Sequence, residues 1–310
     1  MAKRGKIIIA CAITGAIHTP TMSPYLPISL GEIATDAIEV AHAGVAILHL
    51  HAHGPENGRP DQASEGFSRF LPTVKLGKKA VINITTGGSP FMNVEERVRP
   101  AAEFKPEVAS LNLGLINFGL YQLLDKYKNF NFDWEREYQE STRDLIFLNS
   151  FKDIEFILKI CYHNGTRFQF KCYDTAPLYN LEHFANCGLV KPPFFVQSVF
   201  DLLGGIGSHS KDVAHIKCTA DRLFSNDLRW SVLGAGTAQL RIAAQAVAIG
   251  GNIRVGLEDS LWASKGILAK SNAEQVRLAR KIIEGLGLAV VPPDEARGIL
   301  ALKGRDLVNF

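Results

Sequence analysis

Eight short apolar segments that alternate with amphipathic segments constrain the fold of this 310-residue chain more than any other feature. The apolar segments read as continuous runs, which is typical of parallel strands buried on both faces. The spacing between them indicates helices, the first of them opened by the capping-box pattern Ser29-x-x-Glu32. Strands are predicted at residues 7–14, 45–51, 80–85, 108–113, 168–173, 194–200, 230–235 and 253–258, and helices near 30–43, 62–77, 151–164, 178–187, 210–224, 237–249, 272–286 and 293–301.

Eight such units predict an α/β fold, a closed (β/α)8 TIM barrel in one domain over residues 1–310. A doubly wound open sheet is the alternative. Residues 115–150 form a segment too long for an ordinary barrel loop, so we expect a folded insert after the fourth strand. Its aromatic and charged residues indicate a lid over the site or a subunit contact, and a solvated decoration is the remaining interpretation.

Charge and cysteine content indicate which partners to expect. The chain has 34 Lys and Arg against 31 Asp and Glu, a net charge of +3, so we expect no nucleic-acid surface and no basic membrane anchor. No run approaches the roughly 20 apolar residues of a membrane span. The five cysteines are scattered without a C-x-x-C pair. They predict reduced thiols in a cytoplasmic protein that acts on small molecules.

Three histidines at alternate positions end the second predicted strand, in the order His49, His51 and His53. In a strand, alternate side chains share one face. Together with Glu258 at the eighth strand end, His49 and His51 match the two-His, one-carboxylate set of a catalytic zinc site. A hydrogen-bonded pair of core histidines is the alternative. His53 falls in the His-Gly-Pro turn, and we expect a solvated loop residue.

Two further strand ends carry polar groups. Thr85, Gly87 and Gly88 offer a hydroxyl and approachable backbone N–H groups for a carboxylate or phosphate, although a tight turn at the barrel rim explains them equally well. Arg254 lies four residues before Glu258. It is interpreted as a clamp for a substrate carboxylate or as the partner that orients Asp259, and a buried ion pair without function is the alternative.

Several motifs, in order along nearly the whole chain, resemble the β-keto acid cleavage enzyme family, which includes 3-keto-5-aminohexanoate cleavage enzymes. The motifs are CAITGAIHTPTMSPYLP (11–27), HLHAHGPENGRP (49–60), INITTGG (82–88), ASLNLGLINFG (109–119), SVLGAG (231–236), GGNIRVGLEDSLW (250–262), AKSNAEQV (269–276) and PPDEARGIL (292–300).

The resemblance implies a TIM barrel, usually a homotetramer, that binds one divalent metal, generally zinc. It implies an acyltransferase that condenses a β-keto acid with acetyl-CoA to give acetoacetate and a new acyl-CoA by a Claisen and retro-Claisen route. By position, the resemblance assigns the metal to His49, His51 and Glu258, the general base to Asp259 assisted by Arg254, and the substrate carboxylate to Thr85, Ser110 and the Gly87-Gly88 backbone.

One position bears on specificity. A family member that cleaves an amino-bearing keto acid has a Glu after Thr-Gly-Ala that pairs with the ammonium, and here that residue is Ile17. We therefore expect a substrate without an ammonium at that end. The chain also departs from common family patterns at His53, Lys171, Pro177 and Thr237.

These departures leave two alternatives to the acyltransferase. One is another metal-dependent barrel enzyme, a hydrolase or aldolase, which would act without acetyl-CoA. The other is a catalytically weakened member of the family, which the departures at Pro177 and Thr237 would allow.

Overall fold

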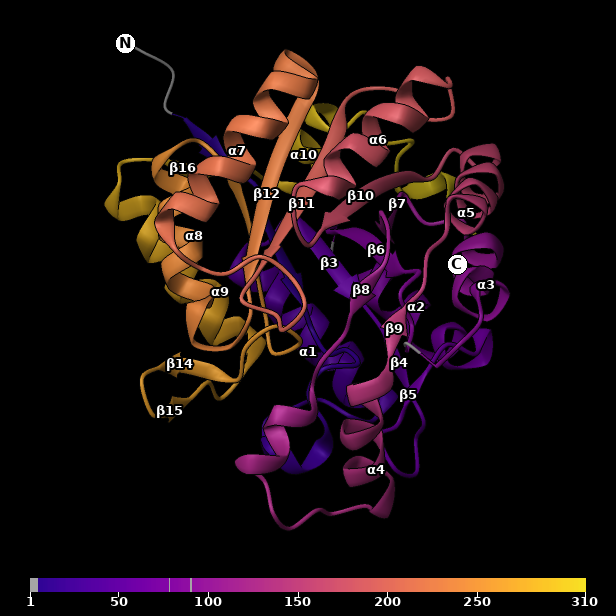
Figure 1. Cartoon of the computed structure of the whole chain (residues 1–310), viewed down its shortest axis with the longest axis vertical. Coiled ribbons are helices and arrows are strands. Elements are labelled where there is room, and N and C mark those ends of the chain that lie inside the picture. Colours follow the sequence, from indigo (N-terminus) through magenta and orange to yellow (C-terminus); the bar gives the residue numbers. More distant parts are fainter. Residues whose placement is uncertain (1–4, 78, 90) are drawn as a thin grey trace.

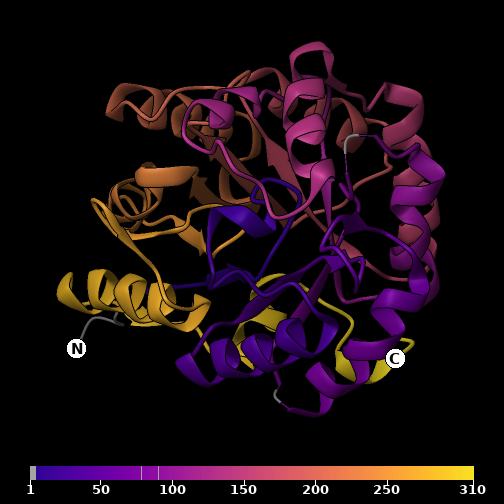
Figure 2. The same ribbon diagram turned by 90° about the horizontal axis from the view of Figure 1, so that it is seen from below.

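Eight parallel strands close into a barrel in the computed structural model, which describes residues 5–77, 79–89 and 91–310 (Figure 1). Helices surround the barrel in the view of Figure 2. The predicted TIM barrel is therefore confirmed, and the open sheet is excluded. Around the barrel the strands are β2 (Ile9–Ala12), β3 (Ile47–Leu50), β6 (Val81–Thr85), β7 (Val108–Asn112), β10 (Arg167–Cys172), β11 (Phe194–Phe200), β12 (Leu228–Gly234) and β13 (Asn252–Val255), and β13 pairs with β2.

Most of the helices lie close to their predicted positions. The capping box is present at the first, where Ser29 Oγ accepts from the Glu32 backbone N–H at 3.2 Å and the Ser29 N–H donates to the Glu32 carboxylate at 2.8 Å. The helices are α1 (Leu30–Ala43), α2 (Ser64–Gly77), α3 (Val94–Phe104), α5 (Phe151–His163), α6 (Ala176–Asn186), α7 (Ser210–Phe224), α8 (Gln239–Ala248), α9 (Asn272–Gly285) and α10 (Pro293–Ile299). No helix in the described ranges is long and apolar enough to cross a membrane.

Helix α3 was not predicted. It begins with a capping box of its own, Asn93 with Glu96, but contains Pro100 and a buried Arg97. The Arg97 guanidinium donates to the backbone oxygen of Leu148 at 3.0 Å and to the Asn149 side chain at 2.8 Å. A cation thus occupies a core-facing position where the helical pattern calls for an apolar residue.

The interior of the barrel has an apolar floor and polar walls. Side chains at the strand starts, including Ile8, Ile47 and Phe195, pack against Ala296 of α10 and close the amino-terminal end. Above this floor the interior is polar, and four of its buried residues are Asn83, Gln169, Gln197 and Ser231. Polar groups therefore reach the carboxyl end of the barrel, where this fold places its chemistry.

Two predicted strands run more than one residue past their observed ends, and the second predicted strand, expected to reach His51, ends at Leu50. The first was expected to run to residue 14 and the eighth to residue 258, but β2 ends at Ala12 and β13 at Val255. Gly256 adopts φ +143°, and a Cβ there would meet the Ala12 carbonyl oxygen at 2.0 Å. The chain turns at this glycine, so Glu258 and Asp259 lie in the turn after β13 and not on the strand.

Residues 115–150 contain helix α4 (Asp133–Ser141), the antiparallel pair β8 (Ile116–Asn117) and β9 (Ile146–Phe147), and short 3-10 turns. In Figure 1 these elements extend from the barrel beside the loop that follows β2. The Thr21 backbone N–H and hydroxyl donate to the Glu135 carboxylate at 3.0 and 2.8 Å, and the Tyr138 hydroxyl donates to the Ala16 carbonyl at 2.7 Å. The insert is thereby fixed to the loop after the first barrel strand.

Candidate active site

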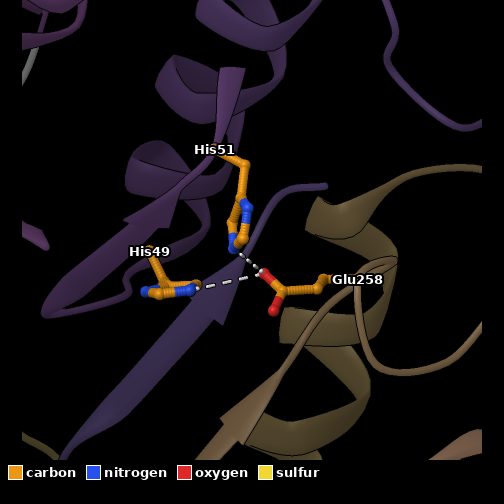
Figure 3. A group of neighbouring side chains, drawn as sticks. All are labelled: His49, His51 and Glu258. Carbon is orange, nitrogen blue, oxygen red and sulfur yellow. Dashed lines mark ion pairs between the residues drawn. The ribbon is translucent and has the colours of Figure 1, made fainter. Parts of the chain in front are cut away.

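His49, His51 and Glu258 converge on one point at the carboxyl end of the barrel (Figure 3). The Nε2 atoms of both histidines lie 3.5 Å from Oε2 of Glu258. All three residues are buried, and these three atoms have no hydrogen-bond partner in the described part of the chain. Unpartnered buried polar atoms are costly unless a ligand completes them. Two imidazoles and one carboxylate fit a divalent metal with open positions for substrate.

The protonation states suit metal binding. Burial lowers the pKa of His49 far below its ordinary value, so the imidazole is neutral and its lone pair is free. Burial also works to raise the pKa of Glu258, but Arg254, His51 and His49 outweigh it, and the net shift is downward. Glu258 is therefore a carboxylate, as a metal ligand must be.

Gly15 makes room for the Glu258 side chain. A Cβ built on Gly15 would lie 2.3 Å from Glu258 Cγ and 2.6 Å from Cδ. No side chain larger than hydrogen fits there unless the carboxylate moves. The loop after β2 therefore leaves space for Glu258 because residue 15 has no side chain.

Arg254 holds both acidic residues of the turn after β13. Its Nε and Nη2 donate to the two carboxylate oxygens of Asp259 at 2.7 and 2.6 Å, and Nη2 also reaches Oε1 of Glu258 at 2.6 Å. Burial raises the pKa of Asp259 although Arg254 opposes the shift. The expected role of Arg254 as the partner that orients Asp259 agrees with this geometry, because both Asp259 oxygens are already engaged by the guanidinium.

A cavity opens beside these residues. One wall is polar and carries His51, Glu258, Asp259 and Arg254, and the predicted substrate-binding residues Thr85, Gly87, Gly88 and Ile17 line it as well. The remaining lining residues are Ala16, Asn112, Phe118, Phe147, Lys171, Tyr173, Val199, Leu202, Leu233 and Ala235.

Ser110 does not line this cavity, although it was predicted to contact the substrate. It lies buried on β7, two residues before Asn112, which shares its face and does reach the cavity. Thr85 also differs in detail from the expectation, because its Oγ1 accepts from the Gly87 N–H at 2.9 Å. Its hydroxyl proton remains available to a ligand.

His53 is not the solvated loop residue expected from sequence. It lies on β4 (Ala52–His53), is 1% exposed, and its Nε2 is 3.1 Å from the Gly15 carbonyl and 3.4 Å from Thr14 Oγ1. Burial, aided by His51, lowers the pKa of His53 to about 4. A neutral imidazole thus braces the loop that makes room for Glu258.

The other departures are scattered. Lys171 lines the cavity, whereas Pro177 is in the first turn of α6 and Thr237 is exposed in the turn η5 (Gly236–Ala238). Phe118 and Phe147 reach the cavity from the insert, a role not predicted for them. The aromatic content of residues 115–150 was the basis for expecting a lid over the site, but it did not single out these two residues.

A family model described as beta-keto acid cleavage enzyme matches residues 6–302. The chain belongs to the β-keto acid cleavage enzyme family. It is 57% identical, over the full length of both chains, to the 3,5-dioxohexanoate:acetyl-CoA acetone transferase of Paraburkholderia graminis. It is 31% identical to the 3-keto-5-aminohexanoate cleavage enzyme of Fusobacterium nucleatum, covering 96% of this chain and 98% of the relative.

Solved structures agree on the fold. The structure described as the apo structure of ObcA aligns with a TM-score of 0.65 at 20% identity, covering 90% of this chain and 66% of that one.

The family model and the relatives identify this chain as an enzyme that cleaves a β-keto acid, as the resemblance implied. The alternative of another metal-dependent barrel enzyme, a hydrolase or aldolase, is wrong.

Proposed function

We propose that this enzyme condenses a β-keto acid with acetyl-CoA and releases acetoacetate and a new acyl-CoA. The observation that carries the proposal is the cavity in which Asp259 lies next to a buried set of His49, His51 and Glu258 whose ligand atoms are unpartnered. The names of three relatives include acetyl-CoA, which supports acetyl-CoA as the second substrate.

Asp259 serves as the general base. It removes a proton from C2, between the carboxylate and the keto group, and Arg254 keeps the carboxylate in place. C2 then attacks the acetyl carbonyl and coenzyme A leaves as thiolate. The thiolate attacks C3, the C2–C3 bond breaks, and acetoacetate departs with the electron pair and recovers a proton at its carbon. The Thr85 hydroxyl and the Gly87-Gly88 backbone orient the substrate carboxylate, with the Gly87 N–H shared between Thr85 Oγ1 and the substrate.

We assign a divalent metal, zinc, to His49, His51 and Glu258, and when bound it supplies Lewis-acid polarisation of a carbonyl oxygen. The donor set supports zinc, because two imidazoles and one carboxylate are a common catalytic zinc set. Other divalent ions accept the same ligands, so elemental analysis of the purified protein, with no added metal, decides between them.

The substrate in this proposal is 3,5-dioxohexanoate. The relative that shares 57% of the sequence is named for this acid, and the apolar Ile17 beside the cavity offers no partner for an ammonium. The products would be acetoacetate and acetoacetyl-CoA. With carbon-labelled acetyl-CoA, the label must appear in free acetoacetate and not in the acyl-CoA, and the reverse distribution would disprove this route.

The insert carries the proposed contact of a homotetramer. On β9 and the residue after it, Phe147 faces the cavity while Ile146 and Leu148 point outward, 55% and 58% exposed. The inner face of the insert thus closes the cavity, and its outer face suits a second copy of the chain. Light scattering tests this: Leu148→Glu should reduce the mass, and an unchanged tetramer would exclude this face. We expect the assembly in the cytoplasm, in line with five free cysteines.

A further inference from the structure

Lys171 is a buried cation without a partner. It lies on β10, 8% exposed, and lines the cavity. In the described part of the chain no hydrogen bond or salt bridge reaches its ammonium. The carboxylates of Glu258 and Asp259 attract this ammonium without hydrogen-bonding to it. A cation that lines the cavity wall without a hydrogen bond points to a ligand that it meets there.

The other cation of the cavity is already engaged. Arg254 gives Nε and Nη2 to Asp259 and shares Nη2 with Glu258. Around the barrel, β10 is four strands from β2. The candidate metal ligands lie on or just after β3 and β13, the two neighbours of β2. Lys171 therefore faces the candidate metal site from across the barrel mouth.

The surface beside Lys171 is apolar. Val199 lies on β11, the strand paired with β10, and Leu202 lies just after it. Leu233 lies on β12. Phe118 and Phe147 of the insert complete this side of the cavity. Such a wall accommodates a short acyl tail, and it strengthens any hydrogen bond that the tail makes because water is excluded.

The keto acids for which two relatives are named differ at C5. An amino group stands there in 3-keto-5-aminohexanoate, and a keto oxygen stands there in 3,5-dioxohexanoate. An ammonium at C5 would be repelled by Lys171, whereas a carbonyl oxygen would accept a hydrogen bond from it. A shape-matched acid with no oxygen at C5 would leave the buried ammonium unpaired, which is the condition under which a polar site discriminates strongly.

We propose that Lys171 is the specificity-determining residue of this enzyme and donates a hydrogen bond to the δ-carbonyl oxygen of a β,δ-diketo acid. This assignment rests on the proposed function for the reaction, but it concerns the end of the substrate away from the bond that breaks. The methyl end of the acid lies against Val199, Leu202 and Leu233.

Turnover of two acids by the metal-loaded full chain tests the proposal. The wild type and Lys171→Met are compared on 3,5-dioxohexanoate and on 3-oxohexanoate, which lacks the δ-carbonyl. We expect kcat/KM of the variant to fall about 10- to 100-fold on the first acid and by less than about threefold on the second. Equal losses on both acids, or no loss on either, would overturn the role.

Two variants serve as controls. Lys171→Gln keeps a donor without the charge and should retain part of the preference for the dioxo acid. Lys152→Met, on the exposed side of α5, should leave kcat/KM unchanged for both acids. The tail of 3-oxoadipate ends in a carboxylate. If the wild type prefers this acid to 3,5-dioxohexanoate, Lys171 does not meet a carbonyl oxygen and the proposal is overturned.

Binding separates this inference from the proposed function. If the wild type turns over none of the acids with acetyl-CoA, the proposed reaction fails. Calorimetric titration of the same two acids, without acetyl-CoA, still tests Lys171, because Lys171→Met should weaken binding of 3,5-dioxohexanoate and leave that of 3-oxohexanoate within about threefold. Equal affinities of wild type and variant for the dioxo acid would refute the contact.

Discussion

Arg254 engages both carboxylate oxygens of Asp259, through Nε at 2.7 Å and Nη2 at 2.6 Å, inside a site where both side chains are 1% exposed. The planar guanidinium fixes the carboxylate in position as well as in charge. In the proposed reaction, a carboxylate held in this way would accept a proton from C2 of the substrate without reorganisation.

Asp259→Asn should therefore lower kcat by about 10²- to 10⁴-fold while the fold persists, because the amide has the shape of the carboxylate but cannot accept the proton. The sharpest measurement is deuterium exchange at C2 of the β-keto acid in heavy water without acetyl-CoA, read above the spontaneous rate. Wild-type exchange should exceed the background and the variant should not. Full exchange by Asp259→Asn would mean that another residue is the general base.

The candidate metal site of His49, His51 and Glu258 leads to a prediction that needs no activity assay. A bound ion at 1,000 times its Kd stabilises the native state by about 4 kcal/mol, so a chelator should lower the unfolding temperature of the wild type. His51→Ala removes one ligand and should abolish both the bound metal and the chelator effect. A variant that keeps stoichiometric metal by elemental analysis would show that the ion binds at another place.

Sequence reasoning predicted this set because its signals are local. Alternate positions place His49 and His51 on one face, and Glu258 follows another strand end on the same barrel rim. The burial of His53 could not be predicted, since it depends on the Gly15 carbonyl, 38 residues away along the chain. Lys171 was visible as a departure, but its lack of a partner is a property of the folded cavity.

Helix α3, which was not predicted, and the end of β13, which was predicted too late, differ from the expectations for a related reason. Arg97 fills a core-facing position of α3 by bonding to backbone and side-chain oxygens 51 and 52 residues away. Gly256 ends β13 early because the chain there lies against the Ala12 carbonyl oxygen. Hydrophobic periodicity reports neither a distant hydrogen bond nor a close backbone approach.

Gly15→Ala should disable the site without unfolding the barrel. The added methyl would lie 2.3 Å from Glu258 Cγ, so the carboxylate must swing away from His49 and His51. We expect metal content to fall at least about tenfold, with far-ultraviolet circular dichroism unchanged. Gly31→Ala is the matched control, because its methyl would meet nothing within 4 Å and it lies in α1. Equal metal in both variants would contradict the steric role of Gly15.

Asp36 links stability to pH at a position outside the cavity. Its carboxylate accepts from Asn272 Nδ2, and Asn272 in turn donates to the Ile13 carbonyl at 2.8 Å and accepts from the Leu257 N–H at 2.6 Å. Asn272 thus joins the two loops that carry Gly15 and Glu258. Burial raises the pKa of Asp36 from 3.8 to about 6, although the Asn272 contact opposes the shift.

Because the folded pKa lies above the unfolded one, the native state holds more protons between pH 4 and 6, and this group favours folding as the pH falls through 6. Above pH 7 the buried charge costs about 1–3 kcal/mol. Asp36→Asn keeps an acceptor for Asn272 without the charge, so it should raise the free energy of unfolding at pH 8 and show a shrinking advantage toward pH 5. Urea unfolding at both pH values measures this difference, with exposed Glu65→Gln as the control. An advantage that is independent of pH would mean that Asp36 ionises normally in the folded protein.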